Sequence, residues 1–398
     1  MSMPLMDSFS PPSSSLSSSS SSGAPPPRKP ILFLHATAGA GHTRAAEALV
    51  AAAAQLQLSA QSIDTLDCMS KTFKHMYANA YVDMVQKMPA LWGYLYDAYD
   101  AKRFGSKTQK FRLMLGKLNT RNFRRTLEEV GPAVVVCTHF LPLELLSDWK
   151  RKGKFHLPLA GVVTDISPHS FWVYPHVDRY YVASGDSERE LLRKGIPAEK
   201  IQATGIPIDP VFSVSSSAAK ARAELGLPEK PTVLMMSGGF GVGPMAAMLR
   251  SFAGQTFDCS LVVVAGKNAE LQAQCKEITK TLSVDVTVYG FVNFVHKLLD
   301  AADFVVTKPG GLTMSEILAK GKPMVLVAPI PGQEQRNCEF LLERGAATRL
   351  YDFADAAYHI HRLLKDPPRL EAMSLAAQRI ACPHAALEIV QDLMTRWL

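Results

Sequence analysis

The segment ILFLHATAGAGH at residues 31–42 is a short apolar run followed at once by a glycine turn. The segment TVLMMSGGFGVG at residues 232–243 repeats this plan further along the chain. A continuous apolar run predicts a strand that is buried on both faces, as in parallel sheets covered by helices. The sequence therefore contains two strand–turn–helix units, and each of them opens one half of the chain.

Further apolar runs alternate with helix-forming stretches behind each opening unit. In the first half, the predicted helix 43–57 precedes strands at 133–137, 159–164 and 179–183. In the second half, the predicted elements are strands 260–265, 284–289, 303–307 and 324–328 and helices 268–281, 313–320 and 334–344. This alternation predicts an α/β protein with two Rossmann-like domains that face each other across a cleft. Such a cleft is the usual place for a ligand.

The domain boundary is expected in the turn-rich stretch 205–217. Residues 1–30 are dominated by Ser and Pro, and they have too little apolar surface to offset the entropy of ordering. The expected organisation is a disordered tail at 1–30, an N-terminal domain at 31–210, a linker at 211–230, a C-terminal domain at 231–375 and a C-terminal helix at 376–398 that packs back on the N-terminal domain.

The composition restricts the setting in which the protein works. No apolar run reaches the roughly 20 residues that a membrane-spanning helix needs, so any membrane role is expected to be peripheral. The tail lacks the basic start and apolar core of a secretory signal, and disorder is favoured over an organellar transit peptide. The cysteines at 68, 137, 259, 275, 338 and 382 lack zinc spacing, which predicts buried free thiols in a reducing compartment.

The two glycine turns are candidate phosphate sites. A glycine turn after a strand lets the backbone approach a ligand, and the next helix offers free N–H groups. The alternative is that each turn only connects a strand to a helix. Neither turn has the GxxxxGK[ST] pattern, which argues against an ATPase, and 239–243 does not give GxGxxG.

The stretch TKPGGLTMSE at 307–316 combines a glycine pair with a carboxylate. One interpretation is that Thr313 caps a helix and that Glu316 completes a capping box. The other is that Glu316 lies in the crevice at the sheet edge, where it can accept hydrogen bonds from a ribose diol.

The stretch PIPGQEQRN at 329–337 places several amides and a carboxylate at the start of a predicted helix. Hexose hydroxyls need such a mixture of donors and acceptors. A polar, solvated helix start is the alternative.

Residues 307–337 resemble the UDP-sugar signature of GT-B glycosyltransferases, which include monogalactosyldiacylglycerol synthases, bacterial diacylglycerol glucosyltransferases and the peptidoglycan lipid-intermediate GlcNAc transferase. The resemblance implies that Glu316 holds the ribose, that Glu334 and Gln335 hold the sugar, and that the backbone of Phe291 and Val292 reads uracil. The other donor-binding residues that it implies are Gly41, Gly238, Gly239, Lys308, Gly310, Gly311, Thr313, Gln333 and Asn337.

The N-terminal half resembles the diacylglycerol-glycosyltransferase branch of this group. The residues that carry the resemblance are Gly39–His42 with Ala45, Ala46 and Ala48, then Thr138-His139, Val163-Thr164-Asp165, His169, Trp172 and 177–182. The resemblance covers residues 31 to about 375 and implies an inverting transfer of glucose or galactose from a UDP-sugar to diacylglycerol. One departure is Ala40, where many members carry glycine; alanine would be strained there if that position needed a positive φ.

A glycerol hydroxyl is a poor nucleophile, so transfer needs a base, which is worth roughly 10²–10⁴-fold in rate. His42 is the expected base; an N-cap or phosphate contact is its alternative. Asp165 is a second candidate base, or a group that orients a histidine. His139, His169 and Trp92 are assigned to the acceptor side, although structural roles are equally open for the two histidines. Asp64 and Asp67 do not have DxD spacing, so neither a metal nor another cofactor is expected.

A basic segment from Lys102 to Arg125 contains no acidic residue and follows an aromatic stretch at 88–99. Such a combination suits an anionic membrane surface, because cations attract head groups and aromatic rings enter the interface. A solvated basic helix is the alternative, and no nucleic-acid-binding motif accompanies the segment. The expected location is therefore the cytoplasmic face of a membrane.

Three other functions remain open from the sequence. One is a UDP-GlcNAc-using transferase that acts on another lipid acceptor, and another is a UDP-GlcNAc 2-epimerase, which needs no lipid surface. The third is a UDP-sugar-binding sensor without turnover, against which the presence of His42, Glu316 and the 333–335 loop argues.

Overall fold

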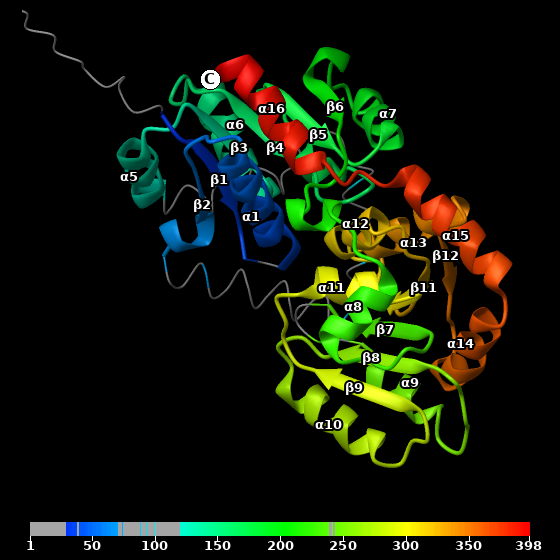
Figure 1. The fold of residues 1–398 in the computed structure, drawn as a ribbon. Coiled ribbons are helices and arrows are strands. Elements are labelled where there is room, and N and C mark those ends of the chain that lie inside the picture. Colours follow the sequence, from blue (N-terminus) through cyan, green and yellow to red (C-terminus); the bar gives the residue numbers. More distant parts are fainter. Residues whose placement is uncertain are drawn as a thin grey trace, which may run out of the picture.

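The structure, a computed structural model, describes residues 29–37, 40–70, 74, 88, 93, 100, 120–238, 241 and 243–398. It contains two six-stranded parallel sheets, one in each half of the chain, and helices pack against both (Figure 1). The prediction of an α/β protein with two Rossmann-like domains is confirmed.

The N-terminal sheet has the strand order β2-β1-β3-β4-β5-β6. Its strands are β1 (Ile31–His35), β2 (Ala60–Asp64), β3 (Val134–Cys137), β4 (Leu159–Val162), β5 (Arg179–Val182) and β6 (Ile201–Ala203). The helices described here are α1 (Ala40–Gln55), α5 (Thr120–Val130), α6 (Phe140–Arg151) and α7 (Gly185–Arg193), with 3-10 turns η1 (Thr65–Cys68), η2 (Ser170–Trp172) and η3 (Ala198–Lys200).

The C-terminal sheet has the strand order β12-β11-β10-β7-β8-β9. Its strands are β7 (Thr232–Met236), β8 (Ser260–Val264), β9 (Asp285–Tyr289), β10 (Phe304–Thr307), β11 (Met324–Leu326) and β12 (Ala347–Arg349). Its helices are α8 (Ala218–Leu225), α9 (Met245–Arg250), α10 (Ala269–Thr279), α11 (Val295–Ala301), α12 (Gly311–Ala319), α13 (Gln333–Glu343), α14 (Ala356–Leu364) and α15 (Pro367–Ile380), with 3-10 turns η4 (Pro210–Ser213) and η5 (Phe353–Asp355).

Both sheets have a point where the direction of strand addition reverses. It lies between β1 and β3 in the first sheet and between β7 and β10 in the second. Leu34 is in register with Cys137, and Met236 is in register with Thr307, so the loops after each pair leave from one edge. Ligands of open parallel sheets bind at such an edge. The glycine turns predicted from the sequence follow β1, β7 and β10, and they therefore lie at the two reversal points.

The last helix, α16 (Ala385–Trp397), returns to the N-terminal domain. Helix α16 lies beside α1 (Figure 1). Its residues Ile389 and Val390 join Phe33 and Leu49 in one buried cluster. The Asp392 carboxylate accepts hydrogen bonds from Arg179 Nε at 3.0 Å and from the Tyr181 hydroxyl at 2.8 Å. The segment 376–398 thus comprises the end of α15 and all of α16.

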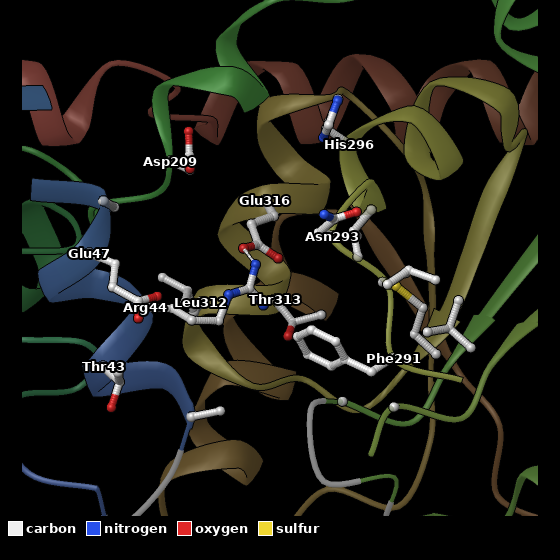
Figure 2. A pocket seen from close by; sticks show the side chains of 18 of the residues that line it. Thr43, Arg44, Glu47, Asp209, Phe291, Asn293, His296, Leu312, Thr313 and Glu316 are labelled. Carbon is white, nitrogen blue, oxygen red and sulfur yellow. Dashed lines mark hydrogen bonds and ion pairs between the residues drawn. The ribbon is translucent and has the colours of Figure 1, made fainter. Parts of the chain in front are cut away.

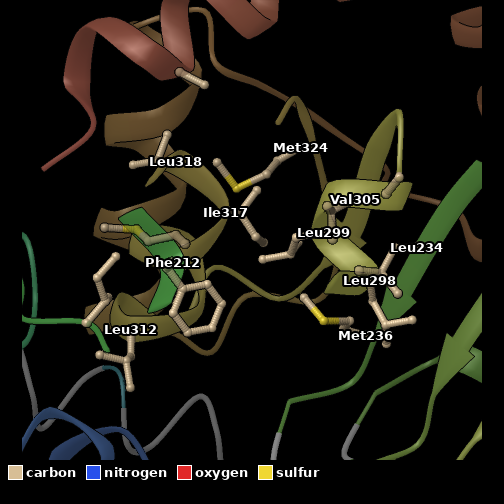
Figure 3. Close-up of a cluster of buried hydrophobic side chains, with 14 of the residues drawn as sticks. Phe212, Leu234, Met236, Leu298, Leu299, Val305, Leu312, Ile317, Leu318 and Met324 are labelled. Atoms are coloured by element: carbon tan, nitrogen blue, oxygen red, sulfur yellow. The ribbon is translucent and has the colours of Figure 1, made fainter. Parts of the chain in front are cut away.

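The C-terminal core contains the side chains that support the cleft. Phe212, Leu299 and Ile317 pack in one buried cluster (Figure 3), and Phe212 belongs to η4. The segment 211–230 therefore contributes η4 and α8 to this core. Ala45 of α1 joins the same cluster, so the two domains share apolar contacts.

The structure corrects two expectations, the burial of all six cysteines and the start of the first helix, and it shows the backbone conformation of Ala40. Cys382 is exposed, whereas the other five cysteines are buried and all six are free. Helix α1 begins at Ala40, three residues before the predicted start at 43. Because Ala40 takes part in the helix and has no positive φ, alanine is unstrained there.

Among the helices of the described ranges, none combines the length and the apolar character that crossing a bilayer requires.

Candidate active site between the two domains

A cavity of about 450 Å³ lies between α1 and the loops of the C-terminal domain (Figure 2). Helix α1 contributes Ala40, Thr43, Arg44, Glu47 and Ala48. These positions recur with helical spacing and form one face of α1. The opposite wall contains Gly238, Phe291, Val292, Thr313 and Glu316. The structure therefore gathers five of the predicted donor-binding residues around one cavity.

Glu316 is a buried carboxylate in the wall of this cavity. It lies inside α12 and forms an ion pair with Arg44 from the other domain (Figure 2). Burial, reinforced by the charge of Asp209, raises the pKa of Glu316 to about 7, although Arg44 opposes the shift. The capping interpretation is wrong: α12 begins at Gly311 with Gly310 as N-cap, so Glu316 is the sixth helical residue.

The glycine pair before α12 lies against the N-terminal domain. A Cβ atom at Gly311 would overlap the carbonyl oxygen of Thr164, whereas a Cβ at Gly310 would meet nothing within 4 Å. Glycine is therefore needed at Gly311 for close domain contact. The free N–H groups of the first turn of α12 remain suited to an anion.

Phe291 and Val292 form the rim of the cavity on the side of β9. Phe291 is 64% exposed, and the Lys267 ammonium lies 5.3 Å from the centre of its ring. Gly238 has a φ of 71°, a conformation that favours glycine. An exposed aromatic ring at a cavity rim is available to a planar base.

The first turn of α13 contains a second carboxylate, Glu334. Its Oε2 atom accepts a hydrogen bond from the backbone N–H of Ile330 at 2.9 Å and lies 3.8 Å from the Lys308 ammonium. Burial raises the pKa of Glu334, although Lys308 opposes the shift. Lys308 and Glu334 thus form a charged pair next to the α12 turn.

Asn337 joins the two domains. Its Oδ1 atom accepts from the backbone N–H of Ile166 at 3.2 Å, and its Nδ2 atom donates to the carbonyl of Pro309 at 3.0 Å. The residue is fully buried, so these two bonds hold α13 against the loop after β4 and against the turn before α12. Gln335 points along α13, where its Nε2 atom donates to Glu339 Oε1 at 2.8 Å. Gln333 is the first residue of α13.

His42 lies on a different side of α1 from the cavity-lining face. Its Nδ1 atom lies 2.8 Å from the carbonyl oxygen of Thr138 and 3.0 Å from the hydroxyl of Thr164. The rings of His139 and Trp172 lie 4.5 Å and 6.4 Å from the His42 ring. Burial lowers the pKa of His42 to about 4, although the Thr138 hydrogen bond opposes the shift. The imidazole is therefore neutral at physiological pH. Gly41 precedes it in the first turn of α1.

Asp165 lies in the loop after β4 and faces the C-terminal domain. Burial and the nearby Glu334 raise its pKa to about 7, and a hydrogen bond with Asn337 opposes the shift. A carboxyl group with this pKa can exchange a proton near neutral pH. His42 and Asp165 are thus both placed near the cleft, with different hydrogen-bond partners.

His139 and His169 cap the structural elements that follow them. The Nδ1 atom of His139 accepts from the N–H of Leu141 at 3.0 Å, and that of His169 accepts from the N–H of Phe171 at 3.1 Å. Both residues are buried. These contacts support the structural interpretation of the two histidines.

Asp100 lies at the centre of a network that was not expected from the sequence. Its carboxylate lies 3.0 Å from Arg336 Nη1, 2.7 Å from Lys194 Nζ and 2.9 Å from the N–H of Ser170. Burial opposes its ionisation, but Lys194 and the other partners bring its pKa well below the usual range. Arg336 also donates to Ser167 Oγ at 2.8 Å.

Arg44 is a further cavity residue that was not predicted from the sequence, although the helical spacing of residues 40, 44 and 48 places it on the cavity face of α1.

Some predicted site residues lie outside the described ranges. They are Gly239, Trp92 and most of the segment from Lys102 to Arg125. At the end of that segment, Arg124 and Arg125 pair with Glu128 at 2.8 Å and Glu129 at 2.7 Å on the surface of α5.

Within the part of the chain that is described, no group of three His, Cys, Asp or Glu side chains has metal-binding geometry.

Sequence comparison relates each half of the chain to a known family. The family described as monogalactosyldiacylglycerol (MGDG) synthase matches residues 42–208, and glycosyl transferases group 1 matches residues 218–380. The chain is 29% identical over 383 residues to a processive diacylglycerol beta-glucosyltransferase of Bacillus pumilus, covering 92% of this chain and 94% of the relative. The protein of the same name from Bacillus mycoides is 30% identical over 276 residues, covering 69% and 70%.

Structural comparison agrees at the level of the fold. The crystal structure of Acinetobacter baumannii MurG matches with a TM-score of 0.62 and 14% identity, covering 92% of this chain and 99% of that one. At this identity the likeness concerns the fold alone, and it supports the assignment of two facing domains of the GT-B type.

Proposed function

This chain belongs to the diacylglycerol glycosyltransferase family, and we propose that it transfers a hexose from a UDP-sugar to the free hydroxyl group of diacylglycerol. The observation that carries the proposal is the cavity between α1 and α12, where Glu316, Thr313, Gly238 and Phe291 surround one space. Its chemistry suits a nucleotide: a carboxylate for a diol, an exposed ring for a base and a helix start for phosphate.

The donor is proposed to extend from this cavity toward the loop before α13. The ribose hydroxyls donate to Glu316, and the diphosphate lies at the Gly310–Gly311 turn. The hexose then lies beside Lys308 and Glu334, which are 3.8 Å apart. The buried Asn337 keeps the first turns of α13 against the N-terminal domain and against the Pro309 turn.

The proposed chemistry is a direct displacement at the anomeric carbon. The acceptor oxygen forms a bond to this carbon as the bond to the UDP oxygen breaks, and the hydroxyl proton passes to a base. Attack on an α-linked donor from the opposite side gives a β-glycoside. UDP leaves with additional negative charge, which Lys308 and the N–H groups at the start of α12 stabilise without a metal.

We propose His42 as the base. Its Nδ1 atom carries the proton that is donated to the Thr138 carbonyl, 2.8 Å away, so Nε2 keeps a free lone pair. Asp165 is the second candidate, because its pKa of about 7 is nearer to the operating pH of a general base.

Two further features of the function are proposed. The relatives named diacylglycerol beta-glucosyltransferase favour UDP-glucose, whereas the match to the MGDG synthase family favours UDP-galactose.

The basic segment from Lys102 to Arg125 is proposed to attach the protein peripherally to an anionic membrane surface on the cytoplasmic side, where diacylglycerol is available. Family membership argues against the epimerase and the non-catalytic sensor.

A transfer assay with liposomes of diacylglycerol and phosphatidylglycerol tests the proposal. Radiolabelled UDP-glucose and UDP-galactose are supplied separately, with EDTA present and with His42→Ala as the impaired variant. We expect labelled glycolipid from at least one donor, insensitive to EDTA. Binding of both UDP-sugars without any labelled lipid would exclude diacylglycerol transfer and redirect the search to other acceptors.

A further inference from the structure

Arg44 approaches the donor cavity from the opposite domain. Helix α1 turns by about 100° per residue, so Arg44 lies roughly 200° from His42 and points to another side of the helix. Its guanidinium reaches across the cleft to the carboxylate of Glu316 (Figure 2). The same first turns of α1 therefore present a candidate base to one side and a cation to the other.

The surroundings of Glu316 oppose its ionised form. Its side chain is only 3% exposed, and burial is the largest cause of its raised pKa. Asp209 adds negative charge nearby and raises the pKa further, whereas Arg44 lowers it. The titratable or charged groups that line the cavity with Glu316 are Arg44 and Glu47 of α1, Asp209 before η4, Lys267 after β8 and His296 of α11. Of these groups, Arg44 forms the ion pair with Glu316.

The charge state of Glu316 matters for a ribose ligand. An ionised carboxylate only accepts hydrogen bonds and has about four lone-pair sites, whereas a protonated one carries a donor of its own. Arg44 bonds to one oxygen, Oε1. Lone pairs therefore remain for two hydroxyl groups, and bonds to an ionised acceptor are about twice as strong as neutral ones.

We propose that Arg44 is a positioning residue for nucleotide recognition, which keeps the Glu316 carboxylate ionised and directed into the cavity for the ribose hydroxyls. This inference rests on the proposed function, since it assigns the ribose to Glu316. The Arg44 side chain is 40% exposed, and Glu316 can take up a proton when Arg44 is lost, because its pKa is already about 7, so no unpaired buried charge has to remain. Substitution of Arg44 is thus expected to change binding while the fold is preserved.

The test is equilibrium binding of UDP and of uridine between pH 6 and pH 8.5, by calorimetry with the full chain. Uridine has no phosphate, so its curve is free of phosphate titration and of any direct contact between Arg44 and phosphate. The variants are Arg44→Gln, Arg44→Lys and Glu316→Gln. Arg344→Gln is the matched control, because Arg344 pairs with Asp186 across the domains and does not line the cavity.

We expect both ligands to bind the wild-type chain more tightly as pH rises through about 7. Arg44→Gln should move this transition to higher pH and weaken binding at pH 7.5 by about tenfold. Arg44→Lys should largely restore the wild-type curve, Glu316→Gln should bind weakly at every pH, and Arg344→Gln should behave as wild type.

Other outcomes would overturn the inference in distinguishable ways. An unchanged curve for Arg44→Gln would remove the positioning role. Weakening for UDP but not for uridine would show that Arg44 contacts the phosphate instead, and an equal shift in Arg344→Gln would point to domain closure. A wild-type chain that binds no UDP would overturn the proposed function and this inference together.

Discussion

The Nδ1 atom of His42 lies 2.8 Å from the carbonyl oxygen of Thr138, in the loop that follows the neighbouring strand β3. A carbonyl oxygen can only accept, so Nδ1 must carry the proton and Nε2 must be the unprotonated nitrogen. The hydroxyl of Thr138 in turn donates to the backbone oxygen of His42 at 2.9 Å. Two hydrogen bonds between the same residues thus hold the candidate base in one tautomer and one orientation.

Replacement of His42 should affect the chemical step more than donor binding. We expect His42→Ala to lower kcat by about 10²–10⁴-fold, the usual contribution of a general base, with little change in KM for the UDP-sugar. The reason is that His42 lies off the α1 face that lines the cavity. Steady-state transfer to liposomal diacylglycerol measures both constants, with the exposed His156→Ala as control. A raised KM with unchanged kcat would instead make His42 a donor contact.

The pH dependence of kcat should distinguish the two candidate bases. Burial lowers the pKa of His42 to about 4, so a histidine base stays neutral and active from pH 6 to pH 8. With His42 as base, kcat at saturating UDP-sugar should be nearly flat across this range. Asp165 has a pKa of about 7, so a rate that depends on its ionised form should fall as pH drops through 7. A fall that disappears in Asp165→Asn would identify Asp165 as the base.

Replacement of Gly311 by alanine should weaken the contact between the two domains and lower the stability of the chain. The new Cβ atom would overlap the Thr164 carbonyl oxygen, which belongs to the backbone and cannot move aside easily. Overpacking of this kind costs about 1–3 kcal/mol, so the thermal unfolding midpoint should fall by several degrees. Gly310→Ala is the matched control, because that position has open space and a φ of −69°. Equal midpoints for the two variants in calorimetry would show that this contact contributes nothing.

Loss of the Asn337 amide should destabilise the chain more than loss of the Gln335 amide. Asn337→Ala leaves the Ile166 N–H and the Pro309 carbonyl without their buried partner, at a cost of about 1–3 kcal/mol. Gln335 pairs with Glu339 on an exposed helix face, so Gln335→Ala should change the free energy of unfolding by less than about 0.5 kcal/mol. Urea unfolding followed by circular dichroism compares them. Similar losses would argue against a bridging role for Asn337.

Membrane binding should depend on the cations of the basic segment from Lys102 to Arg125. Each cation near an anionic surface is worth about 1 kcal/mol, so replacing Lys102, Lys107 and Lys110 together by Gln should weaken vesicle binding about 100-fold. Arg124→Gln with Arg125→Gln should have a smaller effect, because both arginines already pair with glutamates on α5. Co-sedimentation with phosphatidylglycerol vesicles measures this, and phosphatidylcholine vesicles are the control. Equal binding by all variants would remove the segment from the membrane contact.

The interior strands could be predicted from the sequence, whereas three strands at sheet edges could not. Strands such as β1 and β7 are continuous apolar runs, because helices cover both of their faces. β2, β6 and β12 are edge strands with polar or only partly buried residues. An edge strand is paired on one side only, so its sequence carries a weaker pattern. The edge strand β9 was still predicted at 284–289, because its valines alternate with other residues.

The sequence by itself determined two strand–turn–helix halves, glycines at the turns and a candidate carboxylate at Glu316, because these depend on neighbouring residues and local backbone conformation. The tertiary structure alone decided which groups meet across the cleft. The Arg44–Glu316 pair joins residues 272 positions apart, and the Asn337–Ile166 bond joins residues 171 apart. It also set the opposite pKa shifts of His42 and Asp165, since burial and nearby charge depend on how the domains pack.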